Sequence, residues 1–137
     1  MFTVLFDARH KVMLTRYSGV FSSDDITSLD DYVAEFFVRE GIYVRNIFDF
    51  SGVEAFAIPC TKLLERGRKL RTNPGQDRVV VAPQQNIYEI FLDYAQAQLD
   101  IGNGTMTVVR GFDDALRLLA LHNPHFKILT RRESLDL

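Results

Sequence analysis

The sequence contains a single cysteine, Cys60. One thiol excludes an intramolecular disulfide and a zinc site made of several cysteines, and it is typical of a reducing compartment. The chain also lacks any uncharged apolar run near the ~20 residues that a membrane-spanning helix requires. Its first residues have neither the basic stretch nor the long apolar run of a signal peptide. We therefore expect a cytoplasmic protein without a transmembrane segment.

An excess of positive charge and the usual catalytic motifs are missing as well. The net charge is −2, which argues against specific nucleic-acid binding. The chain has no nucleophile elbow, no P-loop and no Gly-x-Gly-x-x-Gly motif. His10, His122 and His125 are not accompanied by the carboxylate cluster that a metal site needs. These absences predict a protein that is not an enzyme and holds neither a metal nor a cofactor.

Strand-like and helix-like patterns alternate along the 137 residues, of which 47% are hydrophobic. This size and composition fit a single domain over residues 1–137, with a core over 2–121 and a tail over 122–137. The predicted strands cover residues 2–7, 11–18, 42–50, 77–82 and 105–110, and the predicted helices cover residues 22–40, 57–71, 86–99 and 113–121. The tail either adds a short strand at 126–129 or has no regular structure.

The helix over residues 22–40 has the clearest boundary signals. Ser22 is the expected N-cap, Asp25 can reach back to it, and Gly41 is the expected stop. The residues expected to face inward are Ile26, Leu29, Val33, Phe36 and Phe37. Elsewhere, residues 51–52 are expected to end a strand and Asp113 to cap the last helix.

This order of elements predicts an α/β fold, with a mixed sheet of about five strands covered by helices. The short loop at residues 8–10 predicts an antiparallel hairpin between the first two strands. The alternation of helix and strand then predicts that the strands near 43–50, 78–82 and 105–110 are parallel to one another.

Three segments resemble the signature segments of a known family. They are the entry into the first helix at residues 17–25, the strand end Asn-Ile-Phe-Asp-Phe-Ser-Gly-Val at 46–53, and the segment Val-Val-Arg-Gly-Phe-Asp-Asp-Ala-Leu at 108–116. Together they are similar to the STAS superfamily (sulfate transporter and anti-sigma factor antagonist domains), in its SpoIIAA-like, STAS/SEC14-like branch. The resemblance covers roughly residues 2–121.

The resemblance implies a non-enzymatic regulatory module that acts through protein contacts. In the anti-sigma antagonists, a partner kinase phosphorylates a serine at the start of the second helix. The matching positions here are Ala57, Ile58, Pro59 and Cys60, so the phosphorylatable serine is missing. The SEC14-like side of the resemblance implies the alternative function, a carrier or sensor of an apolar small molecule or lipid.

Several residues near the first βα junctions are candidates for contact with a partner or ligand. Asp49 and Ser51 end a predicted central strand, at the edge of the sheet where ligands bind, although both side chains can instead satisfy the turn. Thr61 can accept phosphate or simply start a helix. Cys60 lies at the start of a helix, where thiols are activated, but on its inward stripe. We expect Cys60 to be buried and slow to react.

Two helix surfaces add further candidates. Lys62, Arg66 and Lys69 form a basic cluster, which is either an anion-binding patch or a solvated helix face. On the third helix, apolar residues that include Tyr88, Leu92 and Leu99 spread well beyond the ~100° that packing on one sheet requires, and Gln98 alone interrupts them. Neighbouring helices, a second subunit or an apolar ligand can cover this surplus. We expect a symmetric homodimer with this helix near its two-fold axis.

Overall fold

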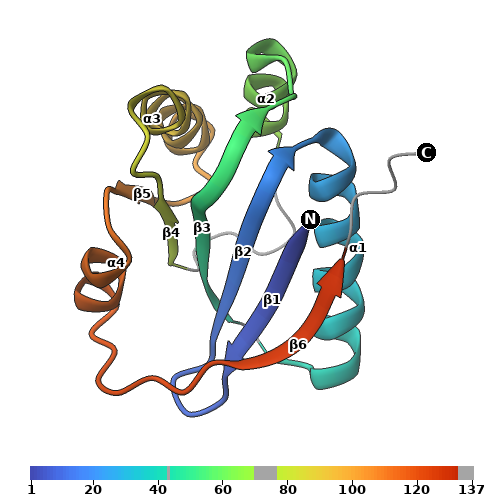
Figure 1. Cartoon of the computed structure of the whole chain (residues 1–137), viewed down its shortest axis with the longest axis vertical. Helices are drawn as coiled ribbons and strands as arrows, with labels where there is room; N and C mark the ends of the chain where they lie inside the picture. Colours follow the sequence, from blue (N-terminus) through green and yellow to red (C-terminus); the bar gives the residue numbers. More distant parts are fainter. Residues whose placement is uncertain (43, 70–76, 133–137) are drawn as a thin grey trace.

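A computed structural model of the chain describes residues 1–42, 44–69 and 77–132. At its centre is a six-stranded mixed sheet with the strand order β5-β4-β3-β2-β1-β6 (Figure 1). The strands are β1 (Phe2–Asp7), β2 (Val12–Phe21), β3 (Arg45–Phe56), β4 (Arg78–Val81), β5 (Met106–Val109) and β6 (Lys127–Arg132). The predicted α/β class and mixed sheet are confirmed, with one strand more than expected.

The strand pairing confirms both the predicted hairpin and the predicted parallel part of the sheet. β1 pairs antiparallel with β2, whereas β2, β3, β4 and β5 pair parallel to one another in that order. The tail supplies the sixth strand, because β6 pairs antiparallel with the other edge of β1. Of the two outcomes left open for the tail, the additional strand is therefore the one observed.

Helices cover the two faces of the sheet unequally. They are α1 (Ser23–Glu40), α2 (Cys60–Gly67), α3 (Gln85–Asp100) and α4 (Phe112–Leu118). The first three pack with one face of the sheet into the larger core. The seven-residue α4 packs on the other face, together with Leu121 and Phe126 (Figure 1). The smaller core leaves part of that second face in contact with solvent.

The boundaries of α1 agree with the sequence signals. Ser22 is the N-cap, and its backbone N–H donates to the Asp25 carboxylate at 3.0 Å. Gly41 ends the helix in the left-handed conformation (φ 65°), and its N–H donates to the carbonyl of Phe37 at 2.8 Å. Tyr32 joins the predicted inward residues as a buried side chain. Local capping chemistry therefore defines this helix well.

Two strands run further than predicted. β2 continues past Gly19 to Phe21, and β3 continues past Gly52 to Phe56. The register between these strands shifts at two points. At Gly52 a Cβ atom would lie 3.0 Å from the backbone oxygen of Tyr17, so only glycine permits this close approach. Irregular pairing accommodates the glycines without ending either strand.

Two helix boundaries also differ from the prediction. The helix predicted over 57–71 begins only at Cys60 and ends at Gly67. The last helix has Gly111 as its N-cap, two residues earlier than predicted, and the Asp114 carboxylate accepts the Gly111 N–H at 3.2 Å. At α4 a local capping contact is therefore present, but it uses Gly111 and Asp114 and not Asp113, whereas α2 begins after Pro59, which makes no side-chain capping bond.

Candidate functional site

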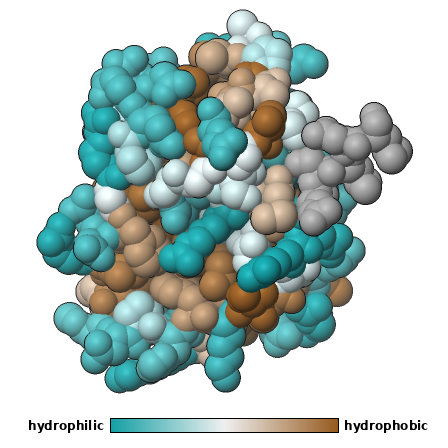
Figure 2. Space-filling view, in the orientation of Figure 1, coloured by the Kyte–Doolittle hydropathy of each residue, from teal (hydrophilic) through white to brown (hydrophobic). Residues whose placement is uncertain are grey.

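One row of polar side chains crosses the part of the sheet that α4 leaves open. Arg131 of β6 pairs with Thr3 of β1, Thr3 pairs with Arg16 of β2, and Arg16 pairs with Asp49 of β3. Residues paired across adjacent strands project from the same face of a sheet. Arg16 and Arg131 are exposed and Thr3 is half-buried. We call these four residues the polar row; Figure 2 shows hydrophilic side chains across the middle of this face.

Arg16 is held in place by two neighbours. Its Nε atom lies 3.4 Å from Oδ2 of Asp49. Its guanidinium carbon lies 5.2 Å from the centre of the Phe112 ring, at the start of α4. A cation over an aromatic ring and beside a carboxylate has a restricted orientation. Both contacts leave the terminal Nη nitrogens of Arg16 without a hydrogen-bond partner among the described residues.

Asp49 and Ser51 lie together and their side chains bond to each other. Oδ1 of Asp49 accepts the backbone N–H of Ser51 at 2.9 Å and its hydroxyl at 2.5 Å. However, Asp49 does not end its strand; it lies opposite Val81, where the neighbouring β4 ends. The Asp49 side chain is only 9% exposed. A ligand on this face would therefore meet Arg16 and the exposed Ser51 before it met the carboxylate.

The polar row is rich in hydrogen-bond donors. Two guanidinium groups and a threonine hydroxyl share one face, and the only carboxylate in the row is already engaged by Arg16 and Ser51. Within residues 1–42, 44–69 and 77–132, no three His, Cys, Asp or Glu side chains gather as metal ligands. Donors of this kind suit the recognition of a negatively charged group.

The predicted anion patch, which lies on α2 and just after it, is partly engaged elsewhere. Lys62, Lys69 and the neighbouring Thr61 are exposed. Arg66, in contrast, donates two hydrogen bonds of 2.7 Å to the Asp30 carboxylate on α1. Burial works to lower the pKa of Arg66, but the Asp30 carboxylate outweighs it and raises that pKa above its ordinary value. Arg66 thus links α2 to α1, and two lysines remain available.

The prediction that Cys60 is buried is wrong, because its side chain is exposed. Leu63 and Gly67, which share its stripe on α2, are buried as predicted. Gly67 packs against α3, where a Cβ atom would lie 3.2 Å from the Tyr94 ring. Only the later part of this short helix is packed, so its first residue stays in solvent.

We therefore expect Cys60 to react in the native protein. An exposed thiol is open to a small aromatic disulfide reagent, and its rate of reaction should lie within about tenfold of the rate in the denatured protein. Absorbance of the released thiol measures both rates. Labelling that required denaturation would show that Cys60 is shielded in solution.

Part of the apolar surplus on α3 is exposed, so the neighbouring helices do not cover all of it. Leu92 and Leu99 are 44% and 54% exposed, and Tyr88 is half-buried. Together with Ala95 they recur at intervals of four, three and four residues, which places them on one side of the helix. We call these four residues the α3 stripe. At its amino-terminal end, the guanidinium of Arg110 lies 3.7 Å from the centre of the Tyr88 ring.

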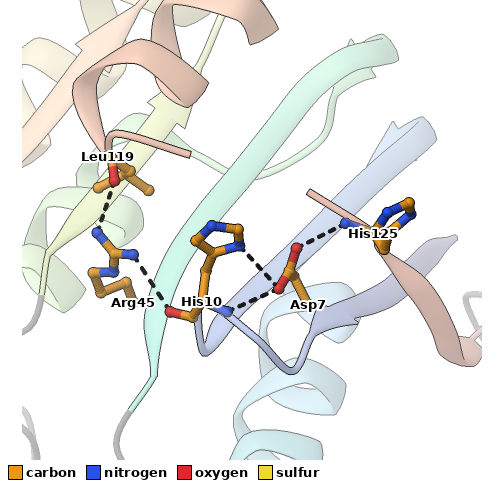
Figure 3. Close-up of polar contacts among 5 residues, drawn as sticks. All are labelled: Asp7, His10, Arg45, Leu119 and His125. Carbon is orange, nitrogen blue, oxygen red and sulfur yellow. Dashed lines mark hydrogen bonds and ion pairs between the residues drawn. The ribbon is translucent and has the colours of Figure 1, made fainter. Parts of the chain in front are cut away.

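Asp7 is a buried site residue that sequence reasoning missed. Its carboxylate, 2% exposed, accepts the N–H and the Nδ1–H of His10 at 2.9 and 3.1 Å and the N–H of His125 at 2.8 Å (Figure 3). Burial works to raise the pKa of Asp7, but these donors outweigh it and hold the pKa below its usual value. Beside it, Arg45 donates to the carbonyls of His10 and Leu119. In the sequence, the one signal for this site was the position of Asp7 at the start of a turn, where aspartates are common.

A buried polar network was missed as well. Gln98, with no exposed surface, accepts hydrogen bonds from Arg78 Nη1 at 2.6 Å and from Asn103 Nδ2 at 2.7 Å. Its own Nε2 donates to the carbonyl of Gly67. Arg78 Nη2 also donates to the carbonyl of Asn103 at 2.6 Å. The network joins α2, α3 and β4. In the sequence it was indicated only by Gln98, an isolated glutamine on an apolar helix face.

No helix in the described part of the chain has the length and apolar character needed to cross a membrane. No family model matches the sequence, and no curated protein matches it significantly.

Proposed function

We propose that the protein is a non-enzymatic binding module of the cytoplasm, built on a STAS-type scaffold and lacking that family's phosphorylatable serine. The mixed sheet with its amino-terminal hairpin supports the scaffold. The residues at the expected switch position, Ala57 to Cys60, carry no hydroxyl group. Without this phosphorylation switch, the module would act through the contacts that its surface makes with a partner.

The observation that carries the proposal is an open apolar edge. β5 is the last strand of the sheet, so its outer side has no strand partner among the described residues. The α3 stripe lies on the side of α3 opposite Ala97, which packs against α2. Because α3 also packs on β5, the stripe and the strand edge form one continuous surface. Soluble proteins seldom leave an apolar surface beside an unpaired strand edge uncovered.

The occupant that fits this surface is a second copy of the chain. If β5 lies against β5 of a second copy across a two-fold axis, the strands run antiparallel. The Arg110 end of one copy then lies beside the carboxyl-terminal end of α3 in the other. That end carries the exposed Asp100 and no basic residue in its last turn. Arg110 would therefore meet both a carboxylate and the negative end of a helix dipole.

The alternative, a carrier of an apolar ligand, requires an apolar cavity. Between α2 and α3 lies a surface groove of about 440 Å³. Its lining residues are Leu64, Arg68, Asp93, Gln96, Ala97, Asp100 and Ile101. The groove lies on the surface and is open to solvent, whereas a carried apolar ligand needs a cavity that encloses it, so this groove supports the interaction module over the carrier.

Replacing Leu92 with glutamate tests the proposal. We expect the unmodified protein to sediment as a dimer and Leu92→Glu to be a folded monomer, with dimer dissociation at least about 100-fold easier, because a charge would be buried at the centre of the interface. Sedimentation equilibrium measures the association, and circular dichroism checks the fold.

Val38→Glu is the control, since Val38 is also an exposed apolar residue (83%) but lies on α1, which packs against β1 at the other side of the sheet from β5. It should leave the dimer intact. A monomeric unmodified protein overturns self-association. If that monomer also binds a hydrophobic dye and Leu92→Glu does not, the apolar-ligand function takes its place.

A further inference from the structure

We propose that the polar row binds a phosphate group, with Arg16 and Arg131 on either side of the Thr3 hydroxyl. The two arginines and Thr3 lie on β6, β1 and β2, at the opposite side of the sheet from the β5 edge. The inference is therefore independent of the proposed self-association, and either one can fail without the other.

The strand register places the two arginines on either side of Thr3. Thr3 pairs with Arg16 on one side and with Arg131 on the other. Neighbouring strands lie about 5 Å apart, so the two arginine backbones are about 10 Å apart. Long side chains that rise from the same face at this separation can meet above Thr3. The next residue confirms the direction of Arg131, because Arg132 lies over the Tyr32 ring of α1, on the opposite face.

The two guanidinium groups are available to a ligand. Asp49 contacts only Nε of Arg16, and Phe112 covers one face of its guanidinium, so neither contact uses an Nη nitrogen. The Arg131 side chain has no hydrogen bond, ion pair or ring contact with the described residues. With Asp49 counted, the row carries a net charge of +1. It is a cationic spot on a chain whose net charge is −2.

The donor set favours phosphate over a carboxylate. A guanidinium presents parallel N–H donors that match two oxygens of a phosphate, and two guanidiniums with a hydroxyl between them can serve three terminal oxygens. A carboxylate has only two oxygens and a single negative charge. The open face admits either free phosphate or a phosphate monoester on a small molecule, and both present the same dianionic group.

An amide NMR titration at constant ionic strength tests the proposal. Inorganic phosphate and glycerol 3-phosphate are the two probes, and acetate is the carboxylate comparison. We expect saturable shifts of the amides of Thr3, Arg16 and Arg131 with phosphate. A similar affinity for both phosphates would show that the phosphate group itself is recognised, and tighter binding of glycerol 3-phosphate would identify the ester as the preferred source.

Four variants locate the binding. Arg16→Gln and Arg131→Gln should each weaken phosphate binding at least tenfold, and Thr3→Val should weaken it a few-fold without changing the charge. Arg39→Gln is the control, because Arg39 is an exposed arginine on α1 that pairs with the adjacent Glu40. The proposal is overturned by non-saturable shifts, by equal affinity for acetate, or by loss of binding in Arg39→Gln to the same extent as in Arg16→Gln.

Discussion

Replacing Gln98 with leucine is expected to lower the free energy of unfolding by about 3–5 kcal/mol. The substitution changes little in volume but removes three hydrogen bonds at once, those with Arg78, Asn103 and Gly67. Arg78 Nη1, Asn103 Nδ2 and the Gly67 carbonyl each lose this partner at a place that water reaches poorly, and the loss of a bond from a charged donor costs most. Domains of this size have about 5–15 kcal/mol of stability in total. The loss is therefore a large part of the whole.

Urea denaturation followed by circular dichroism measures the change. Gln96→Leu is the matched control: the same substitution two residues away on α3, at an exposed position whose amide bonds only Asp100 on the surface. It should change stability by no more than about 0.5 kcal/mol. Equal effects of the two substitutions would show that the network around Gln98 contributes little beyond helix propensity.

Replacing Asp7 with asparagine is expected to lower the free energy of unfolding at neutral pH by about 2–3 kcal/mol. The carboxylate accepts three N–H groups, whereas an amide oxygen is a weaker acceptor and its NH₂ group faces donors. Since one of these donors is His125, the substitution also loosens the connection that leads from α4 into β6.

The pH dependence identifies the cause of the Asp7 effect. The pKa of Asp7 is lower in the folded protein than its ordinary value of 3.8. At pH values near and below 4, the unfolded chain therefore binds more protons at this residue than the folded chain, and stability falls as the pH falls. Above that range the stabilisation is fully present. Asp7→Asn should remove this part of the acid sensitivity, so the two proteins should converge in stability toward low pH.

Asp93→Asn provides the comparison, because Asp93 is an exposed carboxylate on α3. It should leave both the stability at neutral pH and its fall in acid nearly unchanged. Unfolding curves at several pH values between 3 and 7 give these slopes. A difference between Asp7→Asn and the unmodified protein that stayed constant over this range would mean that the Asp7 side chain acts through shape, not through its charge.

Local chemistry in the sequence determined the framework of the fold. Ser22, Asp25 and Gly41 mark the ends of α1 because capping groups satisfy the helix's own unpaired N–H and C=O groups. The short loop at residues 8–10 predicted the hairpin, and the alternation of helix with strand predicted the parallel strands. Each of these signals depends on residues a few positions apart, which the sequence displays directly.

Predictions of where a helix or strand ends relative to the neighbouring helices and strands were less accurate. Gly52 is compatible with a strand end, but the pairing of β2 with β3 carries β3 through it to Phe56. Cys60 shares an inward stripe with Leu63, yet only the later part of α2 meets α3. A helical wheel describes the side on which a residue lies and not how far along the helix the neighbouring element reaches.

Only the tertiary structure decided which distant residues share a site. His125 reaches Asp7 across 118 residues, and Arg78 reaches Gln98 across 20. The polar row exists because β6 returns to the outer edge of β1, which brings Arg131 beside Thr3. Strand order and long-range pairing depend on the total apolar surface that the folded chain buries, and no short segment of the sequence carries that information. For this protein, the residues with the strongest expected effects are therefore those that local patterns left unmarked.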